Sequence, residues 1–160
     1  SLAGTEASGT GNMKFMLNGA PTLGTFDGAN IEIVKLAGEE NNYIFGLREE
    51  EVSQCKEFYN PREIYKASDV VRVAVDALTD ETFSEADECF EKIRTLLFEN
   101  DRYMVLADLE SFVETLLRAA RDYKNKKEYF RKSLLNTANS SFFSSDRTIK
   151  EYADEIWNLR

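Results

Sequence analysis

Apolar residues recur at helical spacing along most of the chain beyond residue 47. Positions three or four residues apart fall on one face, the pattern of an amphipathic helix packed against a core. We expect helices over residues 60–78, 86–97, 108–120, 125–138 and 145–157. The apolar stripes of the first four helices are expected to be buried, including Leu116, Leu117, Phe130 and Leu134.

Capping signals set where these helices begin. Asn60-Pro61 followed by Glu63 predicts one helix start, Asp108 another, and Asn125 with Glu128 a third. The last stripe contains Ile149, Tyr152, Ala153, Ile156 and Trp157. A terminal helix of this kind can also pack against another domain.

The first 46 residues have a different pattern, with short elements separated by glycines. The spacing predicts a helix over residues 10–18, a strand over 22–26, a helix over 31–37 and a strand over 43–45. Gly38 is placed to end the second of these helices. This alternation indicates part of a parallel α/β layer. We therefore expect one mostly helical α/β domain over residues 1–160, with an α/β part at 1–46 and a helical part at 47–160.

Composition narrows the classes of function. The chain of 160 residues has a net charge of −9, which disfavours nucleic acid and anionic membranes as partners. No apolar run reaches the length of a membrane span, and no signal peptide is recognisable. Histidine is absent, which removes Ser–His dyads and histidine metal sites. Cys55 and Cys89 form no metal-like cluster and look like helix fillers in a reduced, cytoplasmic protein.

The segment Ser8-Gly9-Thr10-Gly11-Asn12-Met13-Lys14 carries the clearest chemistry. Glycines ahead of a helix start allow a phosphate to approach free backbone amides, and the helix dipole favours an anion. The chain begins with Ser1 immediately before this segment, and we interpret it as a fragment of a longer protein.

Two common phosphate motifs fail here. A P-loop needs lysine directly after the second glycine, where Thr10 stands, and the dinucleotide pattern needs a third glycine, where Lys14 stands. Pyridoxal phosphate fits better, because Thr10 and Lys14 lie one helical turn apart, about 5.4 Å. Amides near Thr10 could hold the phosphate while Lys14 forms an imine with the aldehyde. A glycine-rich turn followed by a solvated lysine remains the alternative.

The longest recognisable motif runs from Ala3 to Phe15, AGTEASGTGNMKF. It resembles the cofactor-lysine motif of the glycogen/maltodextrin (α-glucan) phosphorylases. The resemblance continues in five further segments: residues 16–20, 27–30, 37–41, 44–46 and 143–152. It is weakest in the middle helices, and Leu2 and Pro21 are small departures.

This resemblance implies a pyridoxal 5'-phosphate enzyme in which orthophosphate attacks a terminal α-1,4-linked glucose and glucose 1-phosphate is released with retention. Lys14 would anchor the cofactor as a Schiff base, and Thr10 and Gly11 would contact its phosphate. Glu6, Ser8 and Gly9 would bind the transferred glucose, although an acid before a helix can also serve only the dipole.

The resemblance also implies the architecture. The chain would be the C-terminal part of the second Rossmann-like domain of a two-domain (GT-B type) glycosyltransferase fold. The N-terminal domain that completes the cleft would be missing, so the fragment is expected to be inactive alone. The full enzyme would be a cytoplasmic homodimer acting on an α-glucan.

Other residues receive structural interpretations. Asp27 at a βα turn suits an Asx-turn or cap, and the runs 39–40 and 49–51 suit solvated charge. The lysines near residue 125 are too few for a nucleic-acid patch. Two alternatives remain: a helical interaction or oligomerisation module using the last apolar stripe, and a pyridoxal-phosphate enzyme with carbanion chemistry, for which no carboxylate partner of the pyridine nitrogen is evident.

Overall fold

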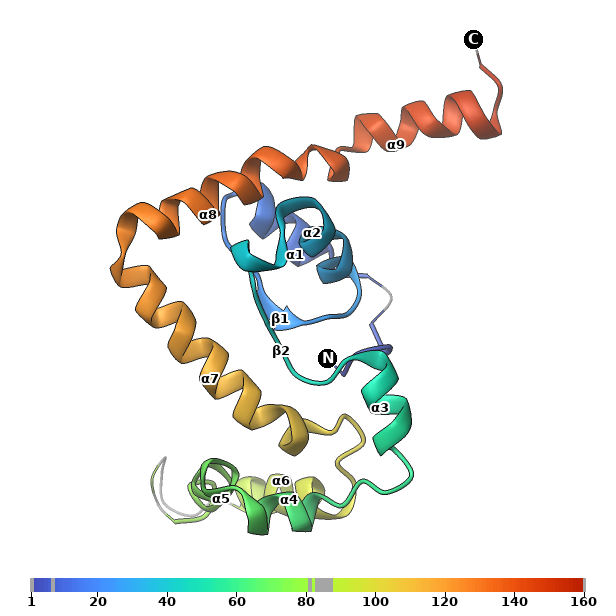
Figure 1. Ribbon diagram of the computed structural model, residues 1–160. Coiled ribbons are helices and arrows are strands. Elements are labelled where there is room, and N and C mark those ends of the chain that lie inside the picture. Colours follow the sequence, from blue (N-terminus) through green and yellow to red (C-terminus); the bar gives the residue numbers. More distant parts are fainter. Residues whose placement is uncertain (1, 7, 81, 83–87, 160) are drawn as a thin grey trace.

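The computed structural model describes residues 2–6, 8–80, 82 and 88–159. Its elements are mostly helices arranged around one small parallel sheet (Figure 1). Strand β1 (Leu23–Thr25) pairs in parallel with β2 (Tyr43–Phe45), with Leu23 opposite Tyr43 and Thr25 opposite Phe45. The predicted α/β alternation at the start of the chain is therefore confirmed.

Two helices accompany these strands. Helix α1 (Thr10–Leu17) precedes β1, and α2 (Ala29–Ala37) with the short 3-10 helix η1 (Glu39–Asn41) connects β1 to β2. Met16 and Ile33 are fully buried where α1 meets α2. Gly38 follows α2 with a φ of +89°, a conformation that suits glycine and ends the helix as predicted.

A group of four helices follows: α3 (Glu49–Cys55), α4 (Pro61–Ala67), α5 (Asp69–Asp76) and α6 (Glu88–Glu99). Asn60 accepts the amide of Arg62 at 3.0 Å, as its predicted capping role requires. The helix predicted from residue 60 to 78 is in fact two, because the Ser68 hydroxyl accepts the amide of Val71 and starts α5. Ala86, predicted to begin the next apolar stripe, lies outside the described residues.

Helix α7 (Val105–Lys124) is longer than predicted and does not begin at Asp108. The carboxylate of Asp101 accepts the amides of Val105 and Leu106, both at 2.9 Å, and so caps the helix. The Tyr59 hydroxyl donates to the same carboxylate at 2.5 Å. Burial and then this bond raise the pKa of Tyr59 far above its usual value.

Asp108 instead ties α7 to the end of β2. Its carboxylate accepts the amide of Leu47 at 2.8 Å, and burial raises the pKa of this carboxyl group above its usual range. Phe112, one turn further along α7, packs edge-on against Phe45 of β2. These contacts fix α7 alongside the sheet.

The chain ends with α8 (Lys126–Asn139), the 3-10 helix η2 (Ser140–Phe143), α9 (Ser145–Glu151) and the π-helical turn η3 (Tyr152–Ile156). Helix α8 packs against α1 and α2, whereas α9 extends away from the other elements (Figure 1). Asn125 accepts the amide of Glu128 at 3.5 Å, as predicted.

Several stripes predicted to be buried are exposed. Phe130 and Leu134 on α8 are 63% and 68% exposed, and Leu116 and Leu117 on α7 are also exposed. Cys55, interpreted as a filler, is exposed as well. The buried apolar residues form separate small clusters, one around Leu2, Val52 and Met104, one around Met16 and Ile33, and one around Val71, Val75 and Leu106. Among the described residues, no helix is both long and apolar enough to cross a membrane.

Gly19 offers a test of the packing between α1 and α8. It has a φ of +77°, and a Cβ added there would lie 2.5 Å from Oγ of Ser133. We expect Gly19→Ala to lower the free energy of unfolding of this chain by about 1–3 kcal/mol, because the methyl group both strains the backbone and overfills the contact. Urea unfolding followed by circular dichroism measures the change.

The matched control is Gly11→Ala in α1. A Cβ added at Gly11 meets no atom within 4 Å, and alanine is the better helix former. This variant should be as stable as the parent chain. Equal losses for the two variants would contradict the proposed steric origin.

Candidate functional site

The glycine-rich segment forms one wall of a polar hollow of about 380 Å³. The lining contains five of the predicted site residues: Glu6, Ser8, Gly9, Thr10 and Gly11. Asn12, Asp27 and Asn30 complete it. These residues come from the N-terminal loop, the start of α1 and the turn between β1 and α2. The residues chosen from the motif, Lys14 excepted, are thus brought together in space, while their roles remain predictions.

The start of α1 is open toward this hollow. Its first hydrogen bond to a residue outside the helix runs from the amide of Met13 to the carbonyl of Gly9, and no side chain caps the helix. Among the described residues, the amides of Thr10, Gly11 and Asn12 have no acceptor. Free amides at a helix N-terminus attract anions, and here they lie on the wall of a hollow.

The two glycines beside these amides serve different purposes. A Cβ at Gly9 would lie 2.8 Å from Cβ of Ala29, so glycine permits the close packing of this turn on α2. A Cβ at Gly11 would enter open space. Gly11 therefore leaves room beside the free amides, as a bound phosphate requires.

Lys14 lies one turn after Thr10 on α1, as predicted, but it does not line the hollow. It is exposed, and its amine has no hydrogen bond or ion pair with any described residue. Phe15 beside it is 63% exposed. Among the described residues, the open helix start therefore faces the hollow, whereas Lys14 lies outside its lining and is exposed.

Glu6 and Ser8 precede the helix start in the sequence, line the same hollow and are both exposed. The Glu6 carboxylate accepts the amide of Ser8 at 3.4 Å through one oxygen. Glu6 also lines a second hollow, of about 620 Å³, which reaches Tyr59 and Arg102. A carboxylate and a hydroxyl beside an anion-binding helix start can hold the hydroxyl groups of a sugar close to a phosphate.

Asp27 in the turn between β1 and α2 and Asn30 near the start of α2 also line the hollow, although sequence reasoning assigned them no functional role. Asn30 is 6% exposed, donates to the carbonyl of Thr25 at 2.9 Å and accepts from Nδ2 of Asn12 at 2.7 Å. Asp27, assigned a structural role, accepts backbone amides of the N-terminal loop. An asparagine directly before the apolar helix pattern of residues 31–37 is the sequence signal that could have identified Asn30.

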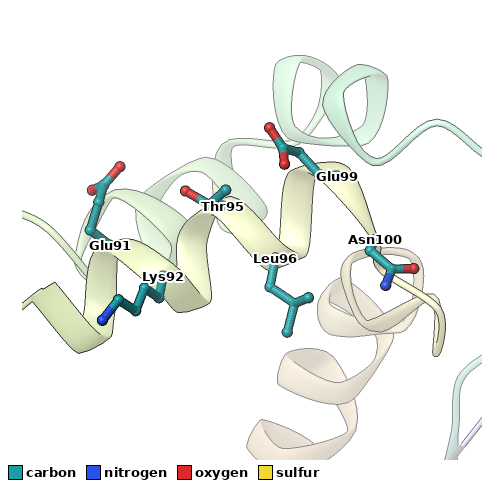
Figure 2. Close-up of a pocket in the computed structure, with 6 residues that line it drawn as sticks. All are labelled: Glu91, Lys92, Thr95, Leu96, Glu99 and Asn100. Atoms are coloured by element: carbon teal, nitrogen blue, oxygen red, sulfur yellow. The ribbon is translucent and has the colours of Figure 1, made fainter.

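A further hollow of about 450 Å³ lies on α6 (Figure 2). Its six lining residues follow one another along that helix and the residue after it, and they include none of the predicted site residues. We assign it no role. No group of three or more potential metal ligands occurs within the described part of the chain.

Several glycogen phosphorylases are similar to this chain over almost its whole length. A brain-form glycogen phosphorylase from Mus musculus is 50% identical over 99% of this chain, and a glycogen phosphorylase from Chlamydia trachomatis is 47% identical over the same share. A muscle-form glycogen phosphorylase from Bos taurus is 48% identical. The chain spans about one fifth of the length of these relatives. Because the family model described as carbohydrate phosphorylase matches residues 1–159, the chain belongs to the carbohydrate phosphorylase family.

Proposed function

We propose that this chain is the C-terminal part of an α-glucan phosphorylase that transfers a terminal α-1,4-linked glucose to orthophosphate and releases glucose 1-phosphate. The observation that carries the proposal is the polar hollow that the open start of α1 lines together with Glu6 and Ser8. The identity of about one half to relatives named glycogen phosphorylase supports the same reaction.

Pyridoxal 5'-phosphate is the proposed cofactor. The amides of Thr10 and Gly11 and the hydroxyl of Thr10 would hold its phosphate, and the helix dipole would favour that charge. Lys14 would anchor its aldehyde end from the next turn of α1. When bound, the cofactor supplies a phosphate group for proton transfer beside the substrate phosphate.

Glu6, Ser8 and Gly9 are the proposed contacts of the transferred glucose. The Glu6 carboxylate keeps one oxygen without a partner among the described residues, and this oxygen can accept a sugar hydroxyl. The Ser8 hydroxyl and the Gly9 backbone lie between Glu6 and the helix start. Sugar and phosphate would therefore be bound on adjoining walls of one hollow.

The exposure of Lys14 and Phe15 supports a site completed by other parts of a longer protein. We propose that this chain is one part of the second Rossmann-like domain of a two-domain (GT-B type) fold, with residues 1–46 at the cofactor and residues 47–160 as helical support. An N-terminal domain would close the cleft over Lys14. A cytoplasmic homodimer is the proposed form of the full enzyme.

The cofactor assignment predicts a specific chemical label. Incubation of the full-length protein with pyridoxal phosphate, followed by borohydride, should attach the cofactor irreversibly to the peptide that contains Lys14, because reduction fixes the amine-bound form. Lys14→Ala should abolish this label, as measured by absorption and peptide mass.

Lys35 gives the control, because it is also an exposed lysine in the last turn of a short helix. Lys35→Ala should be labelled like the parent protein. Labelling spread evenly over surface lysines, with no loss in Lys14→Ala, would refute the assignment.

The incomplete site also predicts where activity is found. The full-length protein should release glucose 1-phosphate from an α-glucan and orthophosphate, whereas residues 1–160 alone should not, because Lys14 is exposed and lies outside the lining of the polar hollow. A coupled assay for glucose 1-phosphate measures both. Turnover by the 160 residues alone would contradict the proposed division of the site.

A helical interaction module is the second candidate, favoured by the exposed apolar face on and after α9. This face contains Ile149, Tyr152, Ile156, Trp157 and Leu159. We propose that the rest of the longer protein covers it, so that it is free for self-association only in the isolated chain.

Ile156→Asp tests the role of this face, since Ile156 is 63% exposed and a carboxylate there opposes burial. The isolated chain should self-associate in sedimentation at micromolar concentration, and Ile156→Asp should shift it toward the monomer. Asn100→Asp adds the same charge at an exposed polar position and should leave association unchanged. A strictly monomeric parent chain would argue against the interaction role.

A further inference from the structure

The carboxylate of Asp27 collects three successive backbone amides of the N-terminal loop. Its Oδ1 accepts the amide of Gly4 at 3.1 Å, and its Oδ2 accepts the amides of Thr5 at 3.2 Å and Glu6 at 2.7 Å. Asp27 is only 6% exposed. Hydrogen bonds to a buried charged acceptor are among the strongest that a protein makes, so the path of residues 4–6 depends on this side chain.

The next two residues hold the other end of the same loop. The amide of Ala29 donates to the carbonyl of Ser8 at 3.3 Å. A Cβ added at Gly28 would overlap that carbonyl oxygen and would lie 2.9 Å from Cγ of Glu6. The loop therefore lies directly on the turn between β1 and α2. Asp27 holds the backbone up to Glu6, and the amide of Ala29 holds the backbone at Ser8.

We propose that Asp27 is a positioning residue that sets the backbone at Glu6 and thereby aims the Glu6 carboxylate at the transferred glucose. This inference rests on the proposed function. Both oxygens of Asp27 accept amides of the loop, and its side chain is buried, so we assign Asp27 to the loop and Glu6 to the sugar. Asparagine in its place would turn an NH₂ group toward one of these donors and release part of the loop.

A double-mutant cycle separates this role from a contribution to stability alone. The full-length protein, loaded with pyridoxal phosphate, is prepared as the parent, Asp27→Asn, Glu6→Gln and the double variant. For each protein, kcat/KM for glucose 1-phosphate is measured in the direction of glucan synthesis, together with cofactor content and melting temperature.

We expect Asp27→Asn and Glu6→Gln each to lower kcat/KM roughly tenfold, with cofactor content unchanged. The double variant should have the same kcat/KM as Glu6→Gln, because misplacing the side chain of residue 6 has no further effect once its carboxylate has been removed. Asp101→Asn is the matched control: Asp101 is another buried acid that accepts backbone amides, and its replacement should leave kcat/KM within about twofold while lowering stability.

Losses that multiply in the double variant, or a parental kcat/KM in Asp27→Asn, would overturn the positioning role. Parental kinetics in Glu6→Gln would instead refute the sugar contact proposed for Glu6, so the two failures are distinguishable. Should Asp27→Asn fail to fold, Asp27→Glu carries the same cycle, since it keeps both oxygens and displaces them by one methylene group. The decrease in kcat/KM that Asp27→Glu causes must likewise disappear when Glu6→Gln is also present.

Discussion

The candidate site depends on one buried side chain, the carboxamide group of Asn30. Its side chain bonds the carbonyl of Thr25 at the end of β1 and the side chain of Asn12 at the start of α1. An amide buried without these partners would be costly, so the two elements are held in one relative position. The hollow lies between them, and its shape follows from this pair of hydrogen bonds.

Much of the first 46 residues could be predicted because their signals are local. The helix at Thr10–Leu17, the strand at Tyr43–Phe45 and the end of α2 at Gly38 each follow from a few neighbouring residues. The glycine-rich motif also predicts that Glu6 and Thr10 belong to one site, and both line the polar hollow. Sequence spacing could not show that Lys14 would be exposed, because the groups that enclose a lysine are distant in the chain.

The contacts that organise the site are long-range and escaped prediction for that reason. Asp27 is more than twenty positions from each amide that it accepts, and Asp101 rather than Asp108 caps α7. In both cases the sequence shows an acid near a helix start, which predicts a cap with equal force. Only the fold determines which backbone amides reach the carboxylate.

The apolar stripes show a related limit. Periodicity predicts which face of a helix seeks burial, but the partner that buries it must be supplied by other segments. Leu117 on α7, Leu134 on α8 and Ile156 after α9 keep the predicted spacing and remain exposed, while the buried residues form small separate clusters. The chain spans about one fifth of the length of its relatives, and these exposed faces agree with the proposal that other segments cover them. The same reasoning applies to Lys14, whose helix forms as predicted and whose side chain is exposed.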